Sequence, residues 1–558
     1  MFGGHRITVV VVLCLFGICA VQSQYAGNSS RKVNEGKRAG DRVYLEHSDE
    51  LKFNRHKNPN AQILDGNVQF SHQGAVLYCD SAHFYEKSNS FEAFGNVKML
   101  QGDTLSLLSD YAFYDGTEQM VMVRHNVVLT HRESVLYTDS LNYDRLYDVG
   151  YFFDGGRMED KTAVLTSDWG EYDTKTKVAT FNFDVRLRDK NFLLVSDTLH
   201  YNTGLSEAHV VGPSDITSGN SHITSTDGYY NTNTERARLF SRSVVRDGAK
   251  VIIADTLYHD AKLGTSEALW NVEYNDTVNK NMLKADYCWY DDSVGYAMST
   301  GKAMAIDYSQ GDSLYMHADT FKIFTYNINT DSVYRVIHAY NKVRAYRTDV
   351  QAVCDSLVFN SLDSCMTLYH DPIVWNFNQQ LLGELIKVYM KDSTIDRAHV
   401  INQALSIEQM ADSVHYNQVS SKEMFAFFDK GEICEARADD NVIAIYHIVD
   451  DSDSSFIAQN NMETSQLRMF LEQRKMKKIW APKSEGVMYP MSQIPPDKKR
   501  LPSFAWFDYV RPLNKEDIFN WRGKKAGSEL KEQKRRDVPV QRLAKPKPPQ
   551  GKSLKVSR

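Results

Sequence analysis

Hydrophobic and polar residues alternate in short runs along most of the chain, and this alternation predicts strands rather than helices. Two runs of strand length, separated by polar turns such as EKSNS and YDGTEQ, recur with a period of about 29 residues. Repeats of this size stack, because no single one can bury its apolar face. We therefore predict an all-β fold: one long antiparallel sheet, folded over on itself, with about 12 repeats between residues 62 and 450.

Each repeat carries a small residue, then an Asp, then an aromatic or apolar residue four positions after the Asp. A GNV tripeptide or a relative of it often follows half a period later, as at residues 66–68 and 95–97. Between Asp355 and Asp412 the series lacks an Asp for one period, and Glu384 occupies that position. The aspartates of the series are Asp80, Asp110, Asp139, Asp168, Asp197, Asp227, Asp255, Asp286, Asp319, Asp355 and Asp412.

The apolar positions around each Asp shift by one residue. Inward residues fall three and one positions before the Asp and two and four positions after it, whereas a straight strand keeps a strict spacing of two. Such a shift predicts a bulge or corner, where a carboxylate accepts hydrogen bonds from freed amides. The rival interpretation is that the carboxylates bind cations. Several of them would then have to meet around one ion, whereas these aspartates repeat along the chain. We predict a structural corner role for Asp80, Asp110, Asp139, Asp168, Asp197, Asp255 and Asp286.

The stretch LYCDSAHFYE, residues 77–86, has the residue types of an active site or a metal site. However, Cys79 occupies a position that holds Ser, Thr or Ala in other repeats, and His83 aligns with Phe113 and Asn142. A nucleophile or a ligand would not vary in this way from repeat to repeat. We predict no catalytic residue, metal site or cofactor, and no enzymatic activity.

The first 23 residues have the layout of a secretory signal peptide: His5 and Arg6, an apolar run, and a small residue at Ser23. A retained membrane anchor and a lipoprotein modified at Cys19 are the less favoured alternatives. The formal net charge of −6 gives no argument for a nucleic-acid partner, and none is predicted. Five widely spaced cysteines follow the signal segment, and a Cys354–Cys365 bridge stays open.

The ends of the chain depart from the repeat. Residues 24–61 form a lead-in, and residues 451–522 form a closing segment that is partly Pro-rich and aromatic. Within it, residues 464–480 fit either a short amphipathic helix or a final pair of strands. Residues 523–558 are predicted to be a disordered basic tail, which is either a solubilising tail or a contact with an anionic surface.

Residues 64–99, LDGNVQFSHQGAVLYCDSAHFYEKSNSFEAFGNVKM, resemble the OstA/LptA-like family of lipopolysaccharide-transport proteins. The family pattern is a GNV strand, a strand with Leu, a small residue and Asp, and a second GNV strand. Here it is matched by residues 66–68, 77–80 and 95–97, with weaker copies over most of residues 62–450. The resemblance implies a twisted β-jelly roll whose apolar interior shields lipid A acyl chains in the periplasm. It also implies pairing with other β-jelly-roll proteins, including an outer-membrane translocon, through exposed edge strands.

From these observations we predict a periplasmic bridge or chaperone that carries lipid A acyl chains toward the outer membrane, with an association with that membrane left open. The alternatives are a structural or glycan-binding secreted repeat protein and an enzyme on a parallel β-helix. The enzyme is disfavoured because no carboxylate cluster interrupts the repeat. The predicted groove-lining residues are Leu77, Leu107, Leu136, Tyr143, Leu165, Leu194, Tyr201, Ile252, Leu283 and Met316.

Overall fold

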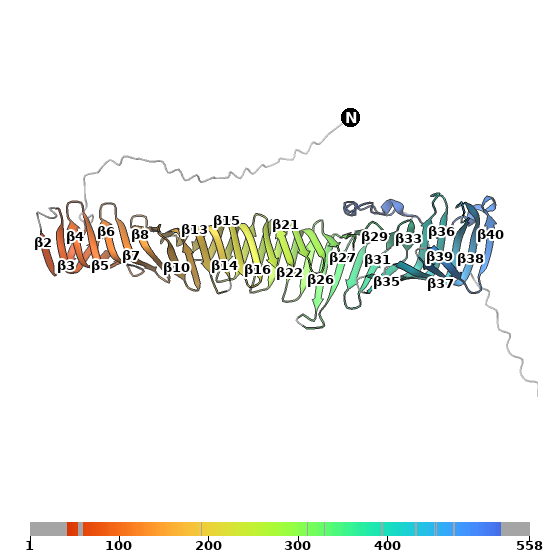
Figure 1. Ribbon diagram of the computed structural model, residues 1–558, viewed down its shortest axis with the longest axis horizontal. Helices are drawn as coiled ribbons and strands as arrows, with labels where there is room; N and C mark the ends of the chain where they lie inside the picture. Colours follow the sequence, from red (N-terminus) through yellow and green to blue (C-terminus); the bar gives the residue numbers. More distant parts are fainter. Residues whose placement is uncertain are drawn as a thin grey trace, which may run out of the picture.

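The described part of the chain is all-β in the computed structural model. It comprises residues 42–525 except 54–59, 191, 310, 329, 392–393, 430–431, 451, 454 and 473–474. Forty strands form one antiparallel sheet that extends along the molecule in chain order (Figure 1). Four short 3-10 helices follow the strands, and the described residues contain no α-helix. The predicted signal peptide and most of the basic tail lie outside these residues.

The strands of the N-terminal half are β1 (Tyr44–His47), β2 (Glu50–Phe53), β3 (Gln62–His72), β4 (Ala75–Tyr85), β5 (Ser90–Gln101), β6 (Leu105–Asp115), β7 (Met120–His131), β8 (Ser134–Asp144), β9 (Val149–Phe152), β10 (Gly156–Asp160), β11 (Ala163–Ser167), β12 (Trp169–Asp173), β13 (Val178–Arg188), β14 (Leu193–Asn202), β15 (Glu207–Ser218), β16 (Ser221–Asn231), β17 (Arg236–Phe240), β18 (Ser243–Asp247), β19 (Lys250–Ala254) and β20 (Thr256–Asp260).

The remaining strands are β21 (Thr265–Asp276), β22 (Asn281–Asp291), β23 (Tyr296–Thr300), β24 (Met304–Asp307), β25 (Leu314–His317), β26 (Thr320–Tyr326), β27 (Tyr334–Tyr340), β28 (Val343–Tyr346), β29 (Val350–Cys354), β30 (Ser356–Asn360), β31 (Cys365–Tyr369), β32 (Ile373–Asn376), β33 (Gln379–Leu382), β34 (Leu385–Lys391), β35 (Thr394–Gln409), β36 (Tyr416–Asp429), β37 (Glu432–Val449), β38 (Phe456–Glu472), β39 (Lys475–Trp480) and β40 (Glu485–Pro490). The 3-10 helices are η1 (Met491–Gln493), η2 (Pro496–Lys498), η3 (Asp508–Val510) and η4 (Asp517–Phe519). Residues 464–472 and 475–480 thus form strands, not a helix.

The sheet is folded into two walls because each long strand bends at its midpoint. β8, for example, pairs with β9 through residues 142–144 and with β10 through residues 134–138, so its two halves belong to different walls. We call wall A the wall that contains β9, β12, β17, β20, β23, β26, β27, β30, β31, β34 and β39. Wall B contains β10, β11, β18, β19, β24, β25, β28, β29, β32, β33 and β40. Apolar side chains of both walls face each other between them.

The bends coincide with register shifts at the predicted corners. The β5–β6 pairing skips between Phe94 and Val97, where Gly95 and Asn96 have positive φ angles of 71° and 42°. The side-chain amide of Asn96 donates a 2.8 Å hydrogen bond to the carboxylate of Asp80. Equivalent contacts join Asn67 to Asp49, Asn126 to Asp110, Asn271 to Asp255 and Asn402 to Glu384.

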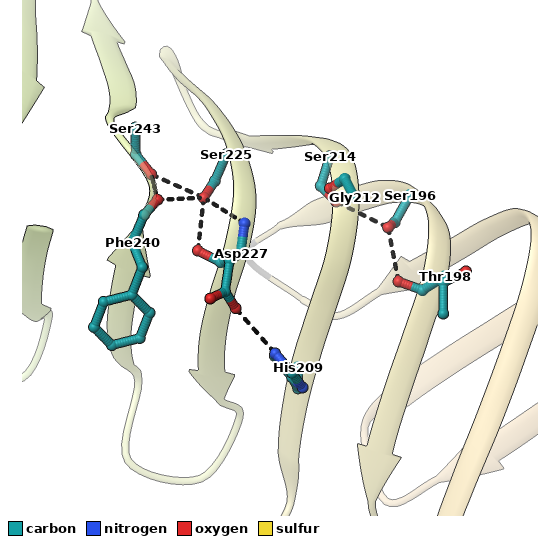
Figure 2. A network of polar contacts seen from close by, with 9 residues as sticks. All are labelled: Ser196, Thr198, His209, Gly212, Ser214, Ser225, Asp227, Phe240 and Ser243. Carbon is teal, nitrogen blue, oxygen red and sulfur yellow. Dashed lines mark hydrogen bonds and ion pairs between the residues drawn. The ribbon is translucent and has the colours of Figure 1, made fainter. Parts of the chain in front are cut away.

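The small residue before the Asp makes its own contact at the bend. In four repeats this residue is Ser or Thr, and its hydroxyl donates to the carbonyl oxygen two residues later: Ser109, Thr138, Ser167 and Ser196. Figure 2 shows the contact of Ser196 with the Thr198 carbonyl at 2.9 Å, and hydroxyls of neighbouring strands joined at 2.8 Å, Ser214 to Ser196 and Ser243 to Ser225. The serines are buried and Thr138 is partly buried, so the hydroxyls satisfy backbone groups that the bend frees from the ladder.

Two aspartates of the sequence series do not occupy corners. At the β16 bend, the corner residues are Ser225 and Thr226, and Asp227 is displaced by one position and contacts His209 at 3.0 Å. Asp412 was expected to mark a further repeat, but it lies in the turn between β35 and β36. There its carboxylate accepts hydrogen bonds from the N–H groups of Val414 and His415.

The residues after β40 run back along the outer face of wall B (Figure 1). We call residues 491–525 the C-terminal strap. The strap starts beside β38 and β40, and η4 at its far end contacts β25 and β28. Phe507 and Val510 are buried against the outer face, with Trp375 and Ile407 of the sheet.

Four buried glutamines on wall B or its adjoining long strands hold the strap. Gln380 accepts a 2.8 Å hydrogen bond from the N–H of Phe507 and donates one to the carbonyl of Ala505. The other three make similar contacts: Gln418 with Leu501 and Lys499, Gln459 with Lys498, and Gln351 with the side chain of Arg511. The extended strap thereby finds partners for backbone groups that pair with no neighbouring strand.

Candidate functional site: the inner face of the folded sheet

The inner face of wall B carries a continuous row of apolar side chains, which we call the wall B row. Each member is directly opposite the next in the strand register, from β16 to β33. The row consists of Ile223, Val245, Ile252, Tyr274, Leu283, Ala305, Met316, Ala345, Ala352, Val374 and Leu381. All but Ala345 are partly exposed. An apolar surface of this kind is suited to the hydrocarbon part of a ligand.

A second row lies on the inner face of wall A. Its members are also opposite one another in the register: Ile323, Ile337, Phe359, Met366, Val388, Ala398, Ala426, Ala436 and Met469. All are partly exposed, and residues nearer the corners, such as Phe321 and Leu368, are buried. Phe359 and Met366 pack into the same apolar cluster as Leu283 and Met316 of wall B, so the two rows line one interior.

The predicted lining residues fall into two groups. Ile252, Leu283 and Met316 belong to the wall B row and are partly exposed. The other seven, Leu77, Leu107, Leu136, Tyr143, Leu165, Leu194 and Tyr201, are buried in one cluster that extends from Val43 to Val210. The structure therefore places the predicted set on the inner face throughout, but in two different environments. Whether any of them contacts lipid stays a prediction.

Polar groups flank the interior at its open side. The hydroxyl of Tyr290 donates a 2.7 Å hydrogen bond to Asp292, and burial followed by this contact raises the pKa of Tyr290 to about 12. Tyr274 has a raised pKa as well, chiefly through burial and then the nearby Asp276. Arg335 acts on both hydroxyls in the opposite direction, which places a cation near both tyrosines. This side of the interior is therefore polar, whereas the rows behind it are apolar.

The thiols show no feature of a reactive centre. Burial raises the pKa values of Cys79 and Cys288 to about 12, so both are protonated at neutral pH. Cys354 and Cys365 are free and form no bridge with each other. Among the described residues, no cluster of His, Cys, Asp and Glu is arranged to hold a metal ion. The same part of the chain contains no helix of the length and apolarity needed to cross a membrane.

At both ends of the sheet, the last strands pair with a neighbouring strand on one side only. β1 and β2 pair with β3, and β39 and β40 pair with β38. Apolar residues are exposed at both ends, including Leu51 and Phe53 at the first and Val487 and Met488 at the second. Unpaired backbone groups beside exposed apolar side chains are the features used in strand addition.

Sequence reasoning missed the wall A row and the glutamines that hold the strap. The wall A row could have been found, because Phe359 and Met366 follow the same alternation that identified Leu283. The glutamines gave no such signal. Gln380 contacts residues 505 and 507, more than 100 positions later in the chain.

Comparison with known proteins gives one family. Residues 40–197 match the model of the family described as OstA-like protein, which confirms the resemblance inferred from the motifs over that range. A solved structure, LptH, the LptA-homologous periplasmic component of the conserved lipopolysaccharide transport device from Pseudomonas aeruginosa, is 13% identical. That match covers 22% of this chain and 82% of LptH, with a TM-score of 0.18. No curated protein matches the chain significantly.

Proposed function

We propose that this chain takes part in lipopolysaccharide transport as a periplasmic bridge or chaperone that holds lipid A acyl chains on its inner face. The observation that carries the proposal is the match of residues 40–197 to the OstA-like family, together with the apolar inner rows. The coarser conclusion, a role associated with lipopolysaccharide transport, rests on the family. The finer one, lipid carriage on the inner face, rests on the following physical argument.

Partly exposed apolar side chains in adjoining strands cost free energy in water, and an acyl chain that covers them removes this cost. The wall B row is continuous from strand to strand, so an acyl chain would meet similar surroundings at each step along the sheet. The free-energy barrier to movement along such a surface is small. No covalent step is required, and the chain would act without catalysis.

Partners are proposed from the ends of the sheet. The edges at β1–β2 and β39–β40 would accept strands of other β-jelly-roll proteins, one of them a translocon in the outer membrane. Export by the signal peptide would place the chain in the periplasm.

The experiment is photo-crosslinking in cells, with benzoylphenylalanine at Leu283 on the inner face. The adjacent residue Lys284, which points to the outer face and contacts Glu273, is the matched control position. We expect adducts with lipopolysaccharide at position 283 and none at position 284. Absence of adducts at 283 in a folded, exported protein would overturn the proposal.

A further inference from the structure

The inward side chains change from buried to partly exposed at β15. On wall A, the inward residues farthest from the corners are buried as far as Tyr201 and Ala208, whereas the next one, Tyr230, is partly exposed and His259 is exposed. On wall B the same change occurs between Leu194 and Ile216. We call residues 61–210 the sealed arm and residues 216–479 the open segment.

A series of hydrogen bonds joins the two walls of the sealed arm on the side opposite the corners. The hydroxyl of Tyr114 on wall A lies 2.6 Å from Nδ1 of His72 on wall B and accepts a 2.7 Å hydrogen bond from Arg145. Arg145 is itself buried and also contacts Gln101 at 3.2 Å. This contact closes the first part of the arm.

The same contact recurs farther along the arm. Tyr172 lies 2.9 Å from Nδ1 of His131, and Tyr201 donates a 3.0 Å hydrogen bond to Asp160. Asp160 is buried and accepts a second hydrogen bond from Ser134, also at 3.0 Å. Tyr143 reaches wall B indirectly: it donates a 3.3 Å hydrogen bond to Asp148, which accepts another of 3.3 Å from Gln101. The four tyrosines of this series are one period apart in the sequence: Tyr114, Tyr143, Tyr172 and Tyr201. We call them the tyrosine seam.

Two internal spaces in the sealed arm are too small for an acyl chain. One internal space, bounded by Leu129, Leu136 and Phe181, has a volume of about 10 Å³. A second, beside Phe70, Leu77 and Tyr114, has a volume of about 20 Å³. Each would hold a water molecule at most.

The seam ends where the open segment begins. Tyr230 continues the spacing of the series, but its ring meets the ring of Phe192 edge to face, with the centroids 4.5 Å apart, and Tyr230 is partly exposed. The next member of the series is His259, which contacts Ser266 on its own wall at 3.0 Å. From this point the wall B row is accessible between the walls.

We propose that the acyl-chain site of this protein is confined to the open segment, and that the sealed arm, closed by the tyrosine seam, takes no lipid. The inference rests on the proposed function and narrows it: the part of the chain that matches the OstA-like family serves as a rigid arm toward a partner. The ligand class is a lipid with hydrocarbon chains long enough to span several strands of the wall B row.

Hydrogen–deuterium exchange of the full chain tests this without any substitution. The probe is rough lipopolysaccharide, which consists of lipid A and core sugars, and the control is the same material after chemical removal of its acyl chains. With the probe at ten times its Kd, we expect exchange to slow by about tenfold in peptides from residues 216–382. Peptides from residues 61–210 should not change, and the control should have no effect.

Each other result has a distinct meaning. Acyl-dependent slowing within residues 61–210 would overturn the confinement and leave the proposed function in place. No acyl-dependent slowing anywhere in the chain would overturn the proposed function and this inference together.

Discussion

At the scale of single residues, the corners account for the periodic aspartates. The spacing of inward residues around Asp80 predicted a register shift, and Leu77 and Cys79 before the Asp and Ala82 after it are all buried. What the sequence could not separate is an Asp at a corner from an Asp in a turn. Asp412 accepts the backbone N–H of Val414, whereas Asp80 accepts the side-chain amide of Asn96, so the same motif serves two different places.

A first prediction concerns Gly95. A Cβ atom at this position would lie 2.5 Å from a carboxylate oxygen of Asp80, and the φ angle is +71°. Gly95→Ala should lower the free energy of unfolding by about 2 kcal/mol or more, because strain and a steric clash add. Gly102→Ala is the control: its φ is +57° with open space around the position, so it isolates the strain alone. Thermal unfolding should show a larger loss of stability for Gly95→Ala than for Gly102→Ala. Equal losses would mean that the Asp80 side chain moves away from the new Cβ atom at no cost.

A second prediction concerns His447, which is buried to 1% exposure. Burial, and then the charge of His415, lower the pKa of His447 to about 4. The unfolded chain therefore binds a proton in a pH range where the folded chain does not. Stability should fall as the pH drops from about 7 toward 4, by about 2 kcal/mol between pH 6.5 and pH 5. Thermal melts of wild type and His447→Gln across this range should differ in slope, and parallel curves would contradict the assignment.

At the scale of elements, the alternation of apolar residues predicted the strands, and the turn motifs predicted the hairpins between them. The C-terminal strap could not be predicted in this way. Its place depends on buried amides such as Gln380 and on aromatic residues such as Trp375, contacts between segments far apart in the chain. Local patterns carry no information on such pairings.

A third prediction tests the strap. Gln380→Leu leaves the N–H of Phe507, the carbonyl of Ala505 and the indole N–H of Trp375 without their partner in a buried setting. We expect a loss of about 2–4 kcal/mol, and detachment of the strap should precede unfolding of the sheet. Limited proteolysis should cut residues 491–525 faster in this variant. Gln379→Leu, at an exposed position that points away from the strap, should leave the cleavage rate unchanged.

At the scale of the whole molecule, one repeating sequence produces two kinds of interior. The fold class and the inward positions could be predicted from the repeat, but the boundary between the sealed arm and the open segment could not. It follows contacts between the walls, such as His131–Tyr172 and Asp160–Tyr201, whose partners are 41 residues apart in the chain.

A fourth prediction compares the two environments. Leu194 is fully buried in the sealed arm, so Leu194→Asp places a charge among apolar side chains and should cost more than about 3 kcal/mol. Leu283 is partly exposed, so Leu283→Asp should cost less than half of that and still fold. Denaturant unfolding measures both variants. Equal losses of unfolding free energy in the two variants would contradict the prediction, because they would mean that Leu283 is packed as tightly as Leu194.

The measurement that tests the central claim most directly is mass spectrometry of the lipid extracted from the mature protein after purification from its own envelope. We predict lipid A-type species in stoichiometric amount, reduced several-fold in Leu283→Asp and unchanged when Lys284 on the outer face is replaced by Gln. A folded wild-type protein that carries no lipid would contradict the account.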